Sequence, residues 1–127
     1  MLYEILAHYL VRVEQAILQC SNAYIERYTE EILTPQRANL RIRLRFEQGH
    51  LLEINAAVVV EDDNLISLDY RYHCQDTHNQ VVFRYDSTPH FPGLQNFPHH
   101  KHLSGDVIGC EKPDIEQVVR EAMEAQG

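Results

Sequence analysis

The chain has 127 residues, a length that fits one domain burying roughly two thirds of the surface of its unfolded form. Its 44% hydrophobic and 24% charged residues, with five glycines and five prolines, argue against disordered, collagen-like and repeat proteins. Eleven Lys and Arg against nineteen Asp and Glu give a formal net charge of −8, which argues against a general nucleic-acid-binding protein. We therefore expect residues 1–127 to form a single domain.

Two further absences restrict the class of protein. No apolar run approaches the ~18 residues of a membrane helix, and the first residues lack the pattern of a signal peptide, so we expect a cytoplasmic protein without a membrane partner. Three widely spaced cysteines form no C-x-x-C pair, which argues against a disulfide framework and a thiolate zinc site.

The N-terminal segment predicts an amphipathic helix from Met1 to about Cys20. Its apolar residues recur at the three- and four-residue spacing of one helix face. Residues 24–33 are rich in β-branched and aromatic side chains and predict a first strand, although their glutamates also permit a second helix.

The central segment predicts a hairpin. Apolar residues alternate with polar ones over residues 39–46 and continue with the same parity over residues 52–60. Both sets share one face only if the loop has three residues, 47–49, with Gly49 in the left-handed conformation. This register places Leu44 opposite Leu52 and Arg43 opposite Glu53.

Two further strands follow, over residues 66–74 and 81–86. In the first, Ile66, Leu68, Tyr70, Tyr72 and Cys74 are expected to point inward. In the second, Val81, Phe83 and Tyr85 are expected inward and Arg84 and Asp86 outward, with His73 beside Arg84 and Arg71 beside Asp86.

The last third predicts a loop and a helix. Apolar residues in residues 87–109 recur at neither the helix nor the strand spacing, which predicts a long loop. Pro113 is expected to begin a helix with one apolar stripe. Together the elements predict an α+β fold, an antiparallel meander of four or five strands with the N- and C-terminal helices packed on one face. The other face of the sheet is expected to meet solvent.

Histidines concentrate in the predicted loop, which holds four of the eight: His90, His99, His100 and His102. The first interpretation is metal-free cleavage of RNA, because imidazoles can transfer protons while cations stabilise the phosphorane. Its candidate catalytic residues are His73, Arg84, His99, His100, Lys101 and His102, with Arg71, Tyr85, Asp86, Arg41, Arg43 and Arg45 as supporting or RNA-binding residues. It requires no cofactor.

Three alternatives stay open. The cross-strand pairs of Arg43 with Glu53 and Arg71 with Asp86 allow the arginines to be only a solvated face. His90, His100, His102 and Asp86 supply enough nitrogen and oxygen ligands for a metal-dependent hydrolase, although their spacing is not diagnostic. The loop and the solvent-facing side of the sheet could also bind another protein without any chemistry.

Three sequence blocks stand out in the last half of the chain: Y-R-Y-H at residues 70–73, F-R-Y-D at 83–86 and F-P-H-H-K-H at 97–102. In their order and spacing they resemble the TumE-like toxin family of bacterial toxin–antitoxin modules. The resemblance implies a small toxin of a type II module, grouped with ribonuclease toxins and silenced by a helix-turn-helix antitoxin of the TumA type. Ser87 and Phe91 depart from the family pattern, which usually has Asn and a second His there. A homodimer is a further open alternative.

Overall fold

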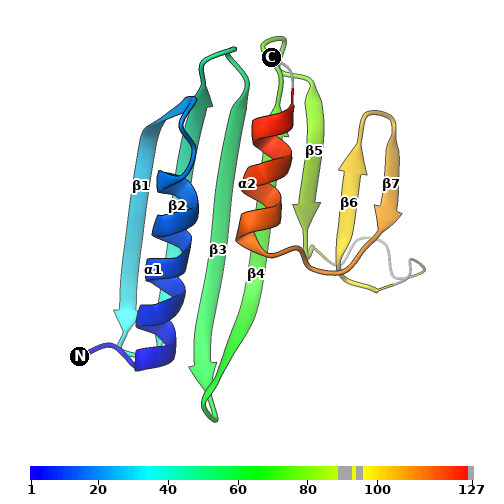
Figure 1. Ribbon diagram of the computed structural model, residues 1–127. Helices are drawn as coiled ribbons and strands as arrows, with labels where there is room; N and C mark the ends of the chain where they lie inside the picture. The colour runs from blue at the N-terminus through cyan, green and yellow to red at the C-terminus, as the bar shows by residue number, and fades with distance from the viewer. Residues whose placement is uncertain (89–92, 94–95, 126–127) are drawn as a thin grey trace.

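The computed structural model describes residues 1–88, 93 and 96–125, which form two helices and seven strands (Figure 1). The elements are, in chain order, α1 (Glu4–Leu18), β1 (Ala23–Thr34), β2 (Arg37–Phe46), β3 (Leu51–Glu61), β4 (Asn64–Gln75), β5 (Val81–Asp86), β6 (His100–Leu103), β7 (Asp106–Gly109) and α2 (Ile115–Glu124). Each strand pairs antiparallel with the next, so the sheet is a meander in the order β1 to β7.

The expected α+β class is right, but the prediction of four or five strands is wrong. Within the described residues the sheet has seven strands, because β6 and β7 lie in the segment that was expected to be a long loop. Each of these strands has only four residues, so neither is long enough to show a clear alternation of apolar and polar side chains. His100, Lys101 and His102 therefore belong to a strand.

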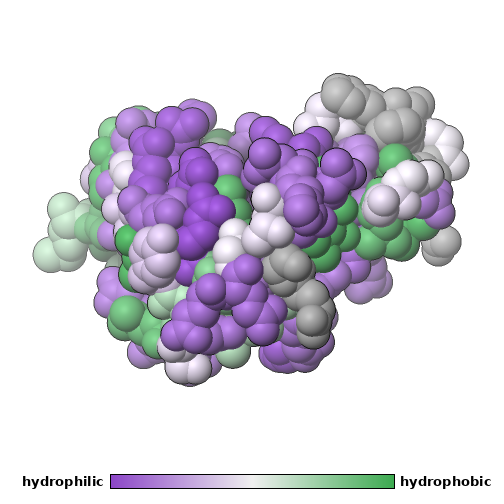
Figure 2. Space-filling view, turned by 90° about the horizontal axis from the view of Figure 1, so that it is seen from above, coloured by the Kyte–Doolittle hydropathy of each residue, from purple (hydrophilic) through white to green (hydrophobic). Residues whose placement is uncertain are grey.

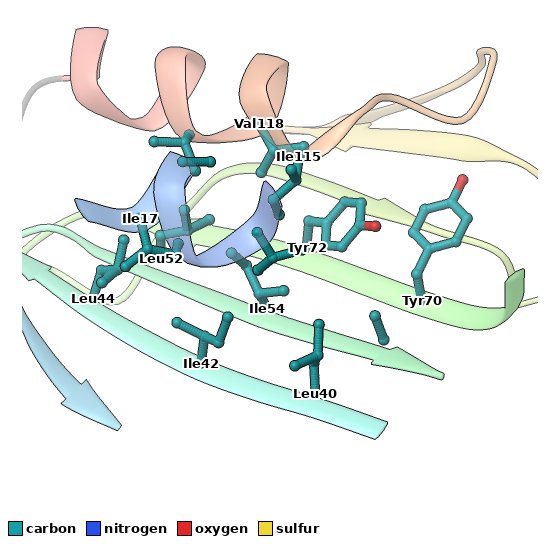
Figure 3. Close-up of a cluster of buried hydrophobic side chains, with 14 of the residues drawn as sticks. Ile17, Leu40, Ile42, Leu44, Leu52, Ile54, Tyr70, Tyr72, Ile115 and Val118 are labelled. Atoms are coloured by element: carbon teal, nitrogen blue, oxygen red, sulfur yellow. The ribbon is translucent and has the colours of Figure 1, made fainter. Parts of the chain in front are cut away.

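Both helices lie on the same side of the sheet, over its first strands, while β6 and β7 extend beyond them (Figure 1). Between the helices and the sheet lies one cluster of buried side chains, which includes Ile17, Leu52, Ile54, Tyr72 and Val118 (Figure 3). Figure 2 looks onto one end of the molecule, where hydrophilic side chains cover most of the surface. We call the side with the helices the covered face and the opposite side the open face.

The predicted hairpin between β2 and β3 is confirmed. Leu44 pairs with Leu52 and Arg43 with Glu53, and Gly49 adopts a φ of 104°. A side chain at Gly49 would be strained at this φ, and its Cβ would lie 2.6 Å from the Thr77 methyl group. The next hairpin is confirmed for His73 opposite Arg84 and Arg71 opposite Asp86. At its turn end the register shifts, so that Val82 packs against the core in place of the expected Val81.

A β-bulge changes which side chains of β4 reach the core. Ala57 pairs with Asp69 but Val58 pairs with Ser67, so Leu68 is an extra residue between them. The alternation reverses at this point, and Leu65 packs against the core while Ile66 and Leu68 are exposed. The prediction that Ile66 and Leu68 point inward is wrong for this reason.

The C-terminal helix begins two residues later than expected. Asp114 is its N-cap, accepts a hydrogen bond from the Gln117 backbone N–H and completes a capping box with the Gln117 side chain. Pro113 therefore precedes the cap. Among the described residues, neither helix has the length and apolar character needed to cross a membrane.

Candidate functional site

Two rows of polar side chains cross the open face. Residues paired on neighbouring antiparallel strands point to the same side and lie next to each other. From β2 to β6, the register gives one row of Arg41, Asn55, Arg71, Asp86 and His100, and a second row of Arg43, Glu53, His73, Arg84 and His102. Most residues of the predicted site are thus brought onto one surface.

The centre of the first row is a buried carboxylate between two imidazoles. Nε2 of His100 lies 2.8 Å from Oδ1 of Asp86, and Nε2 of His102 lies 3.6 Å from Oδ2. Asp86 is 5% exposed and His100 2%, whereas His102 is only half-buried. We call these three residues the Asp–His cluster.

Backbone groups hold the Asp–His cluster in place. Nδ1 of His100 lies 2.8 Å from the Pro98 carbonyl oxygen, and the Thr88 backbone N–H donates to Oδ1 of Asp86 at 3.0 Å. A carbonyl oxygen can only accept, so Nδ1 of His100 carries a proton. These two backbone partners could not be predicted from the sequence, because a backbone carbonyl or N–H can bind whatever side chain its residue carries.

His73 and Arg84 form a second group beside the cluster. The Arg84 Nε–H donates to Nδ1 of His73 at 3.1 Å, so Nε2 of His73 carries the proton and donates to Gln75 at 2.9 Å. Burial lowers the pKa of His73 below its ordinary value, and the nearby Arg84 and Arg71 lower it further, while the hydrogen bond to Gln75 and, more weakly, the charge of Glu53 oppose them. His73 is therefore neutral at pH 7.

Two hollows adjoin these groups. The larger, about 540 Å³, is lined by Arg41, Asn55, Arg71 and Thr88 among others. The smaller, about 250 Å³, is lined by Arg84, His102 and the β6–β7 turn. A ligand in either hollow would contact at least one arginine of the open face.

Lys101 and Tyr85 do not lie on the open face. Glu121 of α2 accepts from Lys101 Nζ at 2.7 Å and from the Tyr85 hydroxyl at 2.6 Å, on the covered face. Although burial alone would lower it, the pKa of Lys101 is raised by hydrogen bonds to Glu121 and Tyr85. The structure therefore separates these two residues from the imidazoles with which the sequence grouped them.

His99 is also set apart from the Asp–His cluster. Nδ1 of His99 lies 2.9 Å from the Tyr70 hydroxyl, and the two rings stack with centroids 5.7 Å apart. Because Tyr70 belongs to the core, His99 sits at the edge of the covered face. His90 lies outside the described residues.

The arginines of β2 differ in their partners. Arg43 and Arg45 bind the two oxygens of Glu26 at 2.9 and 3.2 Å, while Arg41 donates to the Asn55 amide oxygen at 3.4 Å. Glu26 occupies a bulge of β1, so the simple alternation of that strand did not reveal it. Arg43 and Arg45 therefore share an ion pair with one carboxylate, and Arg43 also lies 3.9 Å from Glu53.

The comparisons with known proteins agree with the sequence blocks. No curated protein and no solved structure gives a significant match to the chain. The family model described as "Toxin TumE" matches residues 13–126, which include the Asp–His cluster, His73 and Arg84. Since this match covers most of the chain, the protein belongs to the TumE toxin family.

Proposed function

We propose that this toxin is a ribonuclease of a type II toxin–antitoxin module and cleaves RNA on the open face. The observation that supports this most directly is the contact between Arg84 and the neutral His73, with Arg71 on the adjacent strand. Arginines can bind an RNA phosphate and stabilise its transition state, while a neutral imidazole can accept a proton.

Three arginines are suited to phosphate binding. Within the described part of the chain, Arg41, Arg71 and Arg84 form no ion pair with a carboxylate, unlike Arg43 and Arg45. The net charge of −8 opposes broad binding of RNA, so we expect contact with a short segment only. This favours recognition in the hollow lined by Arg41 and Arg71.

Binding of phosphate would prepare His73 for proton transfer. In the structure, the lone pair on Nδ1 of His73 accepts the Arg84 Nε–H. When Arg84 turns to a phosphate, this nitrogen becomes available to accept the proton of a 2′-hydroxyl. His102 pairs with Arg84 across β5 and β6 and lines the same hollow, which supports a second role for it at the same phosphate.

The test is replacement of Arg84 by Gln, with Arg120→Gln as the matched control on the exposed side of α2. Wild-type protein and the control should arrest growth on induction and degrade RNA, and the purified proteins should cleave RNA. Arg84→Gln should lower cleavage by about 10²-fold or more, because it removes a cation from the developing charge. Growth arrest and cleavage unchanged in Arg84→Gln would refute the proposed site.

A non-catalytic interaction domain is the second candidate. It is favoured by β1, an edge strand on which Tyr24, Ile25, Ile32 and Leu33 are exposed. A helix-turn-helix antitoxin would be the expected partner of such an edge. Tight binding of the product of the adjoining gene, together with no cleavage by the wild-type protein, would favour this candidate.

A further inference from the structure

We propose that the Asp–His cluster (Asp86, His100 and His102) binds one divalent transition-metal ion, with Zn²⁺ the preferred ion. The three ligand atoms lie within 4.8 Å of one another. Two imidazole nitrogens and one carboxylate oxygen are a donor set used by zinc and similar ions, whereas Mg²⁺ and Ca²⁺ prefer oxygen alone.

The separations of the ligand atoms fit one ion. Metal–ligand bonds of about 2.0–2.1 Å at tetrahedral angles place neighbouring ligand atoms about 3.3 Å apart. Nε2 of His100 lies 2.8 Å from Oδ1 of Asp86 and Nε2 of His102 lies 3.6 Å from Oδ2, one shorter and one longer than this value. One ligand atom from each of the three residues lies within 4.8 Å of the other two. Small side-chain rotations would therefore bring both imidazoles and the carboxylate to the same ion.

The strands present the three ligands without any change of fold. Asp86 and His100 are directly paired on β5 and β6, and His102 follows two residues later on the same side of β6. The two imidazole rings meet edge to face, with centroids 4.8 Å apart. Ligands on paired strands of a sheet are held more rigidly than ligands on loops.

The hydrogen bonds around the cluster are those that orient metal ligands. Nδ1–H of His100 points at the Pro98 carbonyl oxygen, which directs Nε2 toward Asp86 as the coordinating nitrogen. The Thr88 N–H fixes one oxygen of the carboxylate. Metal-binding histidines and carboxylates typically have such second partners, and these raise the affinity of the site.

Bound metal would leave a coordination position for water or a substrate oxygen, because the cluster supplies three protein ligands. His102 lines the hollow that Arg84 also lines, so this position would be reached from the open face. A role for the ion in cleavage rests on the proposed function, whereas binding does not. Such a role would replace the metal-free mechanism expected from the sequence.

The test measures metal content and needs no RNA. Protein purified without a histidine tag is stripped with a chelator, dialysed against Zn²⁺ and analysed for bound metal, and Co²⁺ is added in a parallel sample as a spectroscopic probe. We expect about one ion per chain and a Co²⁺ visible spectrum without a thiolate band, which excludes the three cysteines as ligands. Excess Mg²⁺ should not displace the ion.

Two variants and a control complete the test. His102→Gln and Asp86→Asn should each weaken Zn²⁺ binding by about tenfold or more, while His78→Gln, in the exposed β4–β5 turn, should bind as the wild type does. Circular dichroism checks that each variant is folded. Wild-type protein that holds no Zn²⁺ above background would overturn the proposal, and so would a thiolate band in the Co²⁺ spectrum or unchanged binding in folded His102→Gln. Zn²⁺ binding without RNA cleavage would support this site and count against the proposed function alone.

Discussion

The two faces of strands β5 and β6 carry different kinds of side chain. Phe83, Tyr85 and Lys101 point to the covered face, where they contact the core or Glu121 of α2. Their sequence neighbours Arg84 and His102 point to the open face. One strand thus supplies packing on one side and titratable groups on the other, so stability and function should respond to different residues of the same strand.

Phe83→Ala should give the largest effect and tests the covered face. Phe83 is 0% exposed, and truncation of a buried aromatic ring typically costs about 3–5 kcal/mol in the free energy of unfolding. Urea denaturation measures this cost. The adjacent Arg84→Gln should change the free energy of unfolding by less than about 1 kcal/mol. Equal losses of unfolding free energy in the two variants would show that stability depends on both faces of β5.

The side chains of the covered face were easier to predict than those of the open face, for a physical reason. Alternation over residues 39–46 and 52–60 is long enough to fix the register, including Leu44 opposite Leu52. The alternation no longer predicts which face a side chain occupies where a strand has an extra residue, as at Leu68 and Glu26. A bulge there reverses the alternation without a clear sequence signal.

The site was predicted only in part. Parity placed His73, Arg84 and Asp86 together, and the register of β4 and β5 confirms this placement. The strand β6 was missed, so Lys101 was grouped with His100 although alternation in a strand sends neighbours to opposite faces. Catalysis by these residues stays a prediction.

Lys101→Met should have the next largest effect on the free energy of unfolding. It tests whether the contact between Lys101 and Glu121 stabilises the packing of α2 on the covered face. The variant loses the charged contact to Glu121, and we expect a cost of about 1 kcal/mol. Because hydrogen bonds raise the pKa of Lys101 when folded, its contribution is complete below the ordinary lysine pKa of about 10.4 and is lost as the pH rises above it. Thermal melts of the two proteins should therefore differ at pH 8 and converge at about pH 11. A gap that persists at high pH would contradict this assignment.

His73→Gln tests the open face through pH. Burial lowers the pKa of His73, so the unfolded chain binds a proton that the folded chain does not when the pH falls below about 6.5. Wild-type stability should fall there by at most about 1.4 kcal/mol per pH unit from this residue, against the opposing effects of the hydrogen bond to Gln75 and of Glu53. Denaturant midpoints between pH 7 and pH 5 should fall less in His73→Gln. Parallel profiles would show that folding does not lower the pKa of His73.

Arg12→Gln should have the smallest effect and separates the two sources of stability on the covered face. Arg12 of α1 contacts Glu116 of α2 through two hydrogen bonds, of 2.6 and 2.9 Å, but more than half of the arginine side chain is exposed. Solvent and salt screen such a pair, so the variant should lose less than about 1 kcal/mol, and the loss should shrink further at 1 M salt. If Arg12→Gln instead costs as much as Phe83→Ala, then the ion pair between the helices stabilises the covered face as strongly as the apolar cluster beneath them does.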